Sequence, residues 1–364
     1  MLLYKPTQSP QPTDSFVDNS QIKIATFNLF NYLEPPNAFY DFECIYSAQQ
    51  WVKKQLWLKK YLSEFKPDII GFQEVFSSES LRLLVYEQGY NFFQVVEQPK
   101  ITDEFIYSNP VVAIASRYPI VEVDNVSVDT ELAVSMGLSI DFSYSRNVLR
   151  ATIDIPHLGL TDCYVVHFKS KRSMIDADIN NKMSAEALYT EKLKSEISGR
   201  WASSMQRGSE AALLLIHMFA RREDKGFPMV LMGDFNNCLS DGVLRHLLTY
   251  DLSGLKNHNK GTFIDKYWLK DSWALYINSQ QCNSTPLTHL KLKEQRVATH
   301  YYGGKGSVLD YILLSCEFDA CYQGSLFGLS SYQVYDRHLI NPIFERDGQS
   351  TDHGVVLITL ELRI

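Results

Sequence analysis

The stretch PMVLMGDFNNCLS, Pro228–Ser240, decides how the rest of the chain can be arranged. Five apolar or small residues, Met229 to Gly233, run without interruption into Asp234, and Asn236 follows two positions later. A continuous apolar run bounded by turn-forming residues predicts a strand in a sheet that is covered on both faces. Because side chains two residues apart in a strand share a face, Asp234 and Asn236 can point at one ligand. A purely structural turn of Asp and Asn residues explains the pattern equally well.

Length and composition describe an ordinary globular chain with an acidic balance. Its 364 residues are 45% hydrophobic and 21% charged, and the formal net charge is −7. This charge disfavours a protein that coats nucleic acid through a strongly basic surface. The length alone allows two domains, but polar strand ends that meet in one site would require a single domain over residues 21–364.

The cysteines and the N-terminal residues indicate which cellular compartment is expected. The six cysteines include no C-x-x-C pair, so neither a disulfide framework nor a thiolate zinc site is expected. Residues 1–20 are rich in Pro, Ser, Gln and Thr, which predicts a flexible leader, and they lack the basic start and apolar core of a secretory signal. No apolar run is long enough to span a bilayer. We therefore expect a cytoplasmic monomer, with export by another route left open.

Hydrophobic periodicity predicts the strands and helices of an α/β protein. Strands are expected at 21–28, 68–74, 91–96, 111–116, 136–142, 148–155, 160–167, 229–234, 308–314 and 355–362. Amphipathic helices are expected at 47–65 and 78–88, with a largely helical insertion over 173–222 that is clearest at 206–222. Residues 251–300 are polar and loop-rich. We expect 173–205 and 251–300 to shape specificity, because loops on a rigid scaffold usually do.

Polar or ionisable side chains stand at the ends of the predicted strands. They are Asn28, Glu74, His167, Asp234, Asn236, Asp310, Asp352 and His353. Ligands of α/β sheets commonly lie beyond the strand ends, so these side chains can converge without being neighbours in sequence. Each one alone has a structural explanation, such as a helix cap or a surface ion pair. Their joint occurrence favours a functional site.

Five short motifs in order resemble the endonuclease/exonuclease/phosphatase superfamily. They are TFN at 26–28, QE at 73–74, GDFN at 233–236, LDYILLS at 309–315 and TDH at 351–353. As a set they are specific, and they cover nearly the whole chain from residue 21. The resemblance implies an α/β fold, a four-layer α/β/β/α sandwich of two packed mixed β-sheets flanked by helices. It also implies a phosphoesterase site at one edge of the sandwich.

The resemblance further implies a metal site. Glu74 looks like the main metal ligand, with Asn28 and Asp352 nearby in the metal and phosphate network. Phosphoryl oxygens are hard and anionic, so Mg²⁺ held by carboxylates and waters is the natural Lewis acid, with Mn²⁺ as a possible substitute.

The resemblance assigns the remaining strand-end residues to catalysis. Asp234 looks like the residue that positions or activates the attacking water, and Asn236 looks like a ligand of a non-bridging phosphate oxygen. Asp310 would orient His353 in a carboxylate–imidazole dyad. In-line attack by water needs a base on one side and a stabilised leaving oxygen on the other. His353 and His167 are candidates for these two ends, in either order.

The residues after His167 bear on the branch of the superfamily. HFKSK at 167–171 is similar to the histidine-containing secreted-nuclease and sphingomyelinase-like branches, whereas base-excision-type endonucleases have a Pro-Asn pair there. The phosphoinositide phosphatases are disfavoured, because GDFNNC lacks their Tyr-Arg extension. Candidates for substrate-phosphate binding are Lys169, Lys171, Arg172 and Arg207. A solvated basic loop and an exposed helix face explain these cations as well.

The leading hypothesis is an Mg²⁺-dependent phosphodiesterase, a nuclease-like enzyme acting on DNA or RNA. The alternative keeps the chemistry but takes a phospholipid, an inositol phosphate or another small phosphoester. A third possibility is an inactive binding member of the superfamily. Loss of Glu74 or His353 would mark such a member, and both are present.

Overall fold

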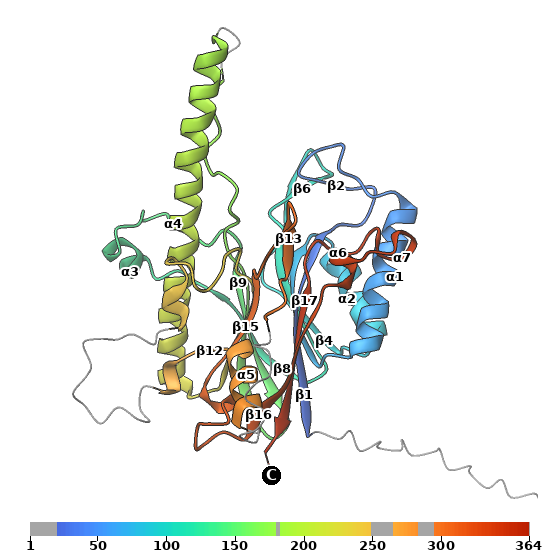
Figure 1. Ribbon diagram of the computed structural model, residues 1–364, viewed down its shortest axis with the longest axis vertical. Coiled ribbons are helices and arrows are strands. Elements are labelled where there is room, and N and C mark those ends of the chain that lie inside the picture. Colours follow the sequence, from blue (N-terminus) through green and yellow to red (C-terminus); the bar gives the residue numbers. More distant parts are fainter. Residues whose placement is uncertain (1–19, 180–182, 249–264, 283–294, 364) are drawn as a thin grey trace, which may run out of the picture.

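Two six-stranded mixed β-sheets pack face to face, and helices cover their outer faces (Figure 1). The computed structural model describes residues 20–179, 183–248, 265–282 and 295–363. The predicted leader, apart from Ser20, lies outside these residues. The α/β/β/α sandwich that the sequence predicts is confirmed.

The first sheet carries Asn28 and Glu74 on its strands, and Asp352 and His353 directly precede one of them. Its strands, in spatial order, are β16 (Phe327–Tyr335), β17 (Val355–Leu362), β1 (Gln21–Tyr32), β3 (Ile69–Val75), β7 (Val111–Ser116) and β4 (Phe92–Val95). β1 runs parallel to β3 and antiparallel to β17. Two helices, α1 (Ala48–Phe65) and α2 (Ser78–Glu87), bury their apolar faces against this sheet. A capping box between Ser47 and Gln50 begins α1.

The second sheet carries the other half of the site. Its strands, in spatial order, are β12 (Lys270–Asp271), β15 (Asp310–Leu314), β11 (Met229–Asp234), β10 (Gly159–His167), β9 (Val148–Ile155) and β8 (Ile120–Val126). β10 and β11 are parallel, so His167 and Asp234 end side by side. The long helix α4 (Ala185–Lys225) packs on the outer face through its C-terminal half.

Smaller elements complete the fold. Two small sheets contain β13 (His300–Tyr302) with β14 (Lys305–Ser307), and β2 (Ala38–Phe39), β6 (Ile106–Ser108) and β5 (Lys100–Thr102). The short helices are α3 (Thr130–Ser135), α5 (Ser272–Cys282), α6 (Arg337–Ile340) and α7 (Phe344–Asp347). Single turns of 3₁₀-helix span Arg245–Leu248, Asp265–Tyr267 and Cys316–Phe318. Among the described helices, none has the length and apolar character needed to cross a membrane.

The main core lies between the two sheets. Inward-facing side chains such as Ile24, Ile114, Val165 and Met232 are fully buried there. The sheets approach closely at Gly71, where an added Cβ would lie 2.9 Å from the Met232 sulfur. Because interiors are close-packed, this contact leaves little freedom in how β3 and β11 are placed relative to each other.

Three expectations from the sequence differ from the structure. The strand expected at 136–142 is wrong, because α3 ends there and the Phe142 amide donates to the Ser139 carbonyl in a turn. β1 continues beyond Asn28 to Tyr32 through a change of register. Within 251–300, the described part contains the helix α5, and residues 251–264 and 283–294 lie outside the described residues.

Candidate active site

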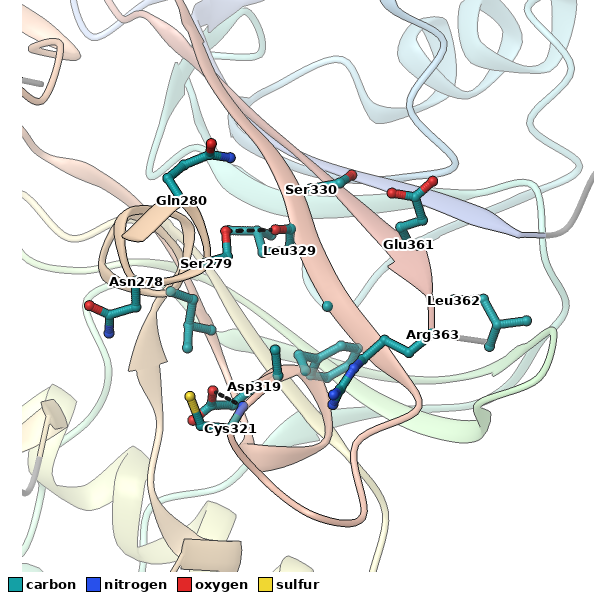
Figure 2. Close-up of a pocket in the computed structure, with 14 residues that line it drawn as sticks. Asn278, Ser279, Gln280, Asp319, Cys321, Leu329, Ser330, Glu361, Leu362 and Arg363 are labelled. Carbon is teal, nitrogen blue, oxygen red and sulfur yellow. Dashed lines mark hydrogen bonds between the residues drawn. The ribbon is translucent and has the colours of Figure 1, made fainter. Parts of the chain in front are cut away.

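A cavity at one end of the described structure lies away from the polar strand ends. It has a volume of about 550 Å³ and is lined by α5, β16 and the end of β17 near Arg363 (Figure 2). That end of β17 pairs with the start of β1 at Gln21, whereas Asn28 lies further along β1. The cavity and the strand-end residues are therefore at opposite ends of the sandwich.

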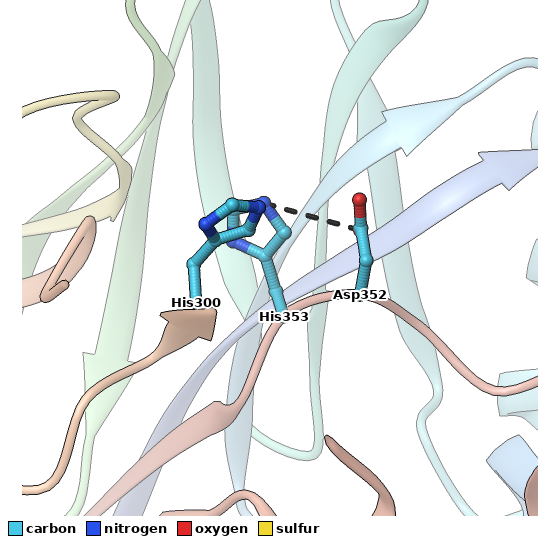
Figure 3. Close-up of side chains that lie close together, drawn as sticks. All are labelled: His300, Asp352 and His353. Carbon is cyan, nitrogen blue, oxygen red and sulfur yellow. Dashed lines mark ion pairs between the residues drawn. The ribbon is translucent and has the colours of Figure 1, made fainter. Parts of the chain in front are cut away.

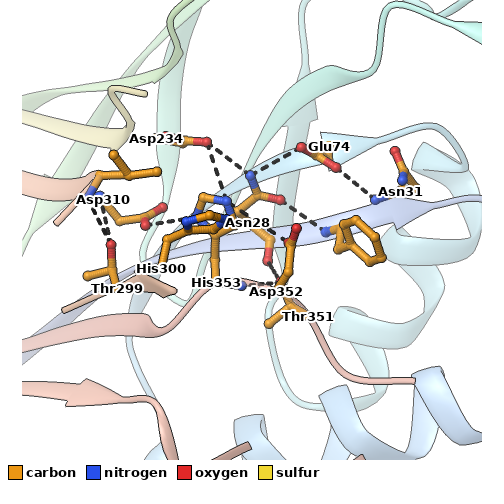
Figure 4. Close-up of polar contacts among 12 residues, drawn as sticks. Asn28, Asn31, Glu74, Asp234, Thr299, His300, Asp310, Thr351, Asp352 and His353 are labelled. Carbon is orange, nitrogen blue, oxygen red and sulfur yellow. Dashed lines mark hydrogen bonds and ion pairs between the residues drawn. The ribbon is translucent and has the colours of Figure 1, made fainter. Parts of the chain in front are cut away.

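The strand ends of both sheets meet around Asn28 (Figure 4). The Asn28 side-chain amide donates to Glu74 Oε1 at 3.4 Å and to Asp234 Oδ2 at 3.2 Å. Glu74 ends β3 in the first sheet, and Asp234 ends β11 in the second. Asn28 is 1% exposed, so this amide joins the two sheets in a buried position.

Unusual backbone conformations direct these side chains into the site. Glu74 and Asn236 have φ values of 60° and 54°, in the left-handed region that non-glycine residues rarely adopt. At Gly233, whose φ is 152°, an added Cβ would lie 2.0 Å from the Val166 carbonyl oxygen. The backbone amide of Asn31 donates to Glu74 Oε2 at 3.0 Å and holds the glutamate in place. Such strain clusters at functional sites, where the surrounding structure supports it.

Asp234 lies at the centre of the cluster. Its Oδ1 accepts a hydrogen bond from the backbone amide of Asn236 at 2.8 Å. Its Oδ2 lies 3.5 Å from His167 Nε2 and 3.8 Å from His353 Nε2, so it has an imidazole on either side. Burial raises the pKa of Asp234, and the charge of the neighbouring His353 opposes that rise.

Asp310 and His353 form a buried pair. His353 Nδ1 lies 2.9 Å from Asp310 Oδ2. The Thr351 hydroxyl fixes the histidine's backbone, since it accepts from the His353 amide at 3.1 Å and donates to the Asn28 carbonyl at 2.7 Å. Burial lowers the pKa of His353, but the carboxylates of Asp310 and Asp234 outweigh it and raise that pKa well above its ordinary value. These carboxylates therefore favour the charged form of His353.

His167 has the opposite electrostatic environment. It is 4% exposed, and burial lowers its pKa well below the ordinary value, assisted by the positive charges of Arg146 and His353. The surroundings thus favour the neutral form of His167 and the charged form of His353. A neutral imidazole can accept a proton and a charged one can donate, which is the division of roles that acid–base chemistry needs.

Oxygen ligands suited to a hard cation lie on one side of the cluster. The Glu74 and Asp352 carboxylates both act electrostatically on Lys54 and Tyr46, so they share a neighbourhood. Asp352 Oδ1 is enclosed, yet among the described residues it accepts no hydrogen bond. Its nearest charged partner in the described structure is His353 Nε2 at 4.0 Å. Two carboxylates, one with a buried oxygen that accepts no hydrogen bond from that part of the chain, fit Mg²⁺ chemically. Glu74, Asp352 and the Asn28 side chain are the residues that could hold it.

Histidines widen the choice of ligands. His300, Asp352 and His353 have donor atoms close enough to share one ion (Figure 3), and so do Asp234, Asp310 and His353. Neither group contains Glu74. His300 was missed in the sequence, where it lies in a polar region without a strand pattern. It reaches the site because β13 pairs with the His353 backbone.

Lys54 is the second residue that the sequence analysis missed. It belongs to α1, is 3% exposed, and donates to the Ser350 carbonyl at 2.9 Å. Burial lowers its pKa to about 7, while Asp352 and Glu74 act in the opposite direction. A signal was present, because Lys54 lies three residues after Trp51 and four before Leu58, on the apolar face of the helix.

The basic residues after His167 separate into exposed and buried ones. Lys171 and Arg172 are exposed, and Lys169 is half-buried. Arg207 differs from the expectation, because it is 2% exposed and its guanidinium donates to the Lys169 carbonyl at 2.8 Å. The Glu210 carboxylate accepts from the Lys169 amide at 2.8 Å. Arg207 and Glu210 are therefore buried side chains that hold the backbone of the loop at Lys169 in place.

Comparisons with known proteins agree with this arrangement. The sequence model described as "Endonuclease/Exonuclease/phosphatase family" matches residues 25–326. No curated protein matches the sequence. Among solved structures, the human Nocturnin catalytic domain with a bound sulfate anion is similar, at 15% identity and a TM-score of 0.53, over 95% of this chain and 94% of that one.

Two further structures share the fold. ANGEL2, a 2′,3′-cyclic phosphatase, has 14% identity and a TM-score of 0.51, over 94% of this chain and 96% of its own. D. rerio TDP2 complexed with a single-strand DNA product has 14% identity and a TM-score of 0.50, over 94% and 99%. These likenesses show the fold alone.

Proposed function

The chain belongs to the endonuclease/exonuclease/phosphatase family of phosphoester hydrolases, and from this premise we propose that it is a divalent-metal-dependent phosphodiesterase acting on DNA or RNA. The observation that carries the proposal is the buried Asp234 carboxylate, whose Oδ2 lies 3.5 Å from His167 Nε2 and 3.8 Å from His353 Nε2. We also propose that residues 21–364 form one catalytic domain, since the site takes residues from strands throughout this range.

We propose Glu74, Asp352 and Asn28 as the residues that hold Mg²⁺, with Mn²⁺ as a substitute. When bound there, the ion would polarise a phosphoryl oxygen as a Lewis acid. The Asn28 side-chain amide donates to both Glu74 and Asp234 and so links the positions of these two carboxylates.

The protein's own groups divide the acid–base work. Asp234 orients the attacking water and receives its proton, and the neutral His167 beside it is the alternative acceptor. His353, held in its tautomer by Asp310, donates a proton toward the leaving oxygen or binds its developing charge. The left-handed Asn236 lies beside Asp234 and can bind a non-bridging oxygen of the phosphate.

Nucleic acid is the substrate class that the surroundings favour. The exposed cations Lys171 and Arg172, with Lys169 beside them, directly follow His167 and can bind neighbouring phosphates. Tyr40 is 47% exposed and within electrostatic range of Glu74 and Arg172, where a ring can stack on an unpaired base. The TDP2 structure with its single-strand DNA product shows that this fold can hold such a strand.

The test is hydrolysis by the purified full chain, in Mg²⁺ and in EDTA. The panel contains single- and double-stranded DNA, RNA, sphingomyelin, a phosphoinositide and an aryl phosphodiester. Asp234→Asn removes the central charge with little change of shape. Asp154→Asn is the matched control, because Asp154 is an exposed carboxylate at the end of β9 that is remote from His167.

We expect cleavage of nucleic acid that requires Mg²⁺, is lost in Asp234→Asn and is retained in Asp154→Asn. Cleavage of lipid or small esters alone would keep the site and overturn the nucleic-acid assignment. Activity in EDTA equal to that in Mg²⁺ would overturn the metal assignment. A folded protein inactive on the whole panel would favour a binding role.

A further inference from the structure

The N-terminal half of α4 projects beyond the two sheets (Figure 1). It forms an arm, which we define as residues 173–179 and 183–205. Residues 173–175 run along one side of the helix, where the Ser195 hydroxyl donates to the Ile175 carbonyl at 2.7 Å and the Met174 amide donates to the Gly199 carbonyl at 3.3 Å. A Cβ at Gly199 would lie 1.7 Å from Ser173 Oγ. Small residues thus line the inner side of the helix.

A stripe of large apolar side chains lies on the other side of the arm. Its members recur every four residues and are Tyr189, Leu193, Ile197, Trp201 and Met205, which are 73%, 62%, 64%, 65% and 48% exposed. At about 100° per residue, each step of four residues turns the row by about 40°, so Leu193, Ile197 and Trp201 share a face that is turned away from Gly199 and residues 173–175. Tyr189 and Met205 lie about 80° to either side of Ile197, at the edges of this face. Soluble proteins rarely expose a contiguous apolar patch of this kind unless it binds something.

The charges around the outer stripe do not suit a membrane surface. Between residues 185 and 205, three acidic side chains, Glu186, Glu191 and Glu196, balance three basic ones, Lys192, Lys194 and Arg200. Helices that lie on anionic lipid carry an excess of Lys and Arg, which supplies much of the attraction. The net charge of −7 for the whole chain would add repulsion.

The same charges suit a second copy of the helix in antiparallel orientation. We propose that the outer stripe binds the outer stripe of another molecule, with Ile197 at the two-fold axis. Leu193 then faces Trp201 of the partner subunit, and Tyr189 lies beside Met205 of the partner subunit at the edge of the contact. Rows of residues four apart form the ridges that interlock in the commonest class of helix packing, with axes crossing at about −50°.

The flanking charges are self-complementary in this arrangement. In the monomer, Arg200 pairs with Glu196 on the same helix at 2.5 Å, with both side chains exposed. Across the two-fold axis, Arg200 comes beside Glu196 of the partner subunit, which extends the two pairs into a network of four charges. Lys194, on the other flank, comes beside the ring of Trp201 of the partner subunit, where a cation–π contact can form.

The expected dimer is weak and reversible. Five side chains of this size can bury on the order of 500 Å² per molecule, or about 1,000 Å² in total, which is near the lower limit for a specific interface. We therefore expect a dissociation constant in the micromolar range. This association is independent of the proposed hydrolysis, and it departs from the monomer that the sequence predicts.

The first test is sedimentation velocity of the full chain, from low micromolar to about a hundred micromolar concentration. We expect a monomer–dimer equilibrium, and Ile197→Glu should raise the dissociation constant by roughly 100-fold, because two unpaired carboxylates would meet at the axis. Leu56→Glu is the matched control, since Leu56 is a 60% exposed side chain on the helix α1. Circular dichroism checks that both variants remain folded.

The second test fixes the orientation by disulfide trapping, with the parent protein as the background for its native cysteines. Ile197→Cys should cross-link to itself, Met205→Cys should not, and a mixture of Tyr189→Cys with Met205→Cys should give the heterodimer. Self-cross-linking of Met205→Cys would show parallel helices and overturn the arrangement. A monomer at every concentration would overturn the proposal, and vesicle binding by that monomer that Ile197→Glu abolishes would assign the stripe to lipid.

Discussion

Replacing Asp310 by Asn tests the centre of the proposed mechanism with a change of one atom. The Asp310 carboxylate lies 2.9 Å from His353 Nδ1 and is one of the three carboxylates that raise the pKa of this histidine. A buried hydrogen bond to a charged group is worth about 1.5–3 kcal/mol, which corresponds to a loss of roughly 10- to 150-fold in kcat. If the amide also favours the wrong tautomer of the imidazole, the loss will be larger.

The pH dependence distinguishes this role from a purely structural one. Asp310 stabilises the cationic form of His353, so its removal lowers the pKa of His353. The high-pH limb of the kcat profile, where the charged imidazole is lost, should therefore move to lower pH. The assay is Mg²⁺-dependent hydrolysis of the substrate found in the panel, with KM expected to change little. A folded Asp310→Asn protein with kcat within threefold of wild type, or with an unmoved high-pH limb, would refute the dyad.

Local patterns predicted the strands that are buried on both faces. β7, β9 and β11 have the bounds expected from their apolar runs, 111–116, 148–155 and 229–234. The runs of β7 and β11 are short and continuous, whereas β9 has Arg150, Thr152 and Asp154 at alternate positions, which is the period of a strand. The strand-end residues could be collected for the same reason. That they meet in space follows only from how the two sheets pack at positions such as Gly71.

Features that depend on distant partners could not be read from the sequence. β16 (Phe327–Tyr335) contains serines and a glutamine, and it becomes a strand by pairing along β17. His300 enters the site through the pairing of β13 with His353. The N-terminal half of α4 has a regular apolar repeat, but its partner surface is not supplied by the described chain. The pattern there indicates a helix and says nothing about what covers it.

Two further predictions concern stability in EDTA. Asp347 is fully buried and accepts from Trp57 Nε1 at 3.2 Å and from Arg337 at 2.7 Å, so Asp347→Asn should lower the free energy of unfolding by about 2 kcal/mol in urea titrations. Burial opposes the shift, but hydrogen bonds from the Ile343 amide and Arg337 lower the pKa of Asp347 to about 2. The stabilisation by the Asp347 carboxylate is therefore present above pH 3.8 and is lost as the pH falls toward 2. If the unfolding free energy of Asp347→Asn fell with acid as steeply as that of the wild type, this assignment would be contradicted. For Lys54, the contribution to stability is predicted to change at higher pH, because burial lowers its pKa from 10.5 to about 7. Between these two pH values the folded protein binds fewer protons than the unfolded chain. Stability from this group should rise through that window by up to about 1.4 kcal/mol per pH unit, and Lys54→Met, which keeps the length of the side chain without its charge, should remove the rise. Unfolding free energies of the two proteins that run parallel from pH 7 to pH 10 would show that Lys54 remains charged throughout.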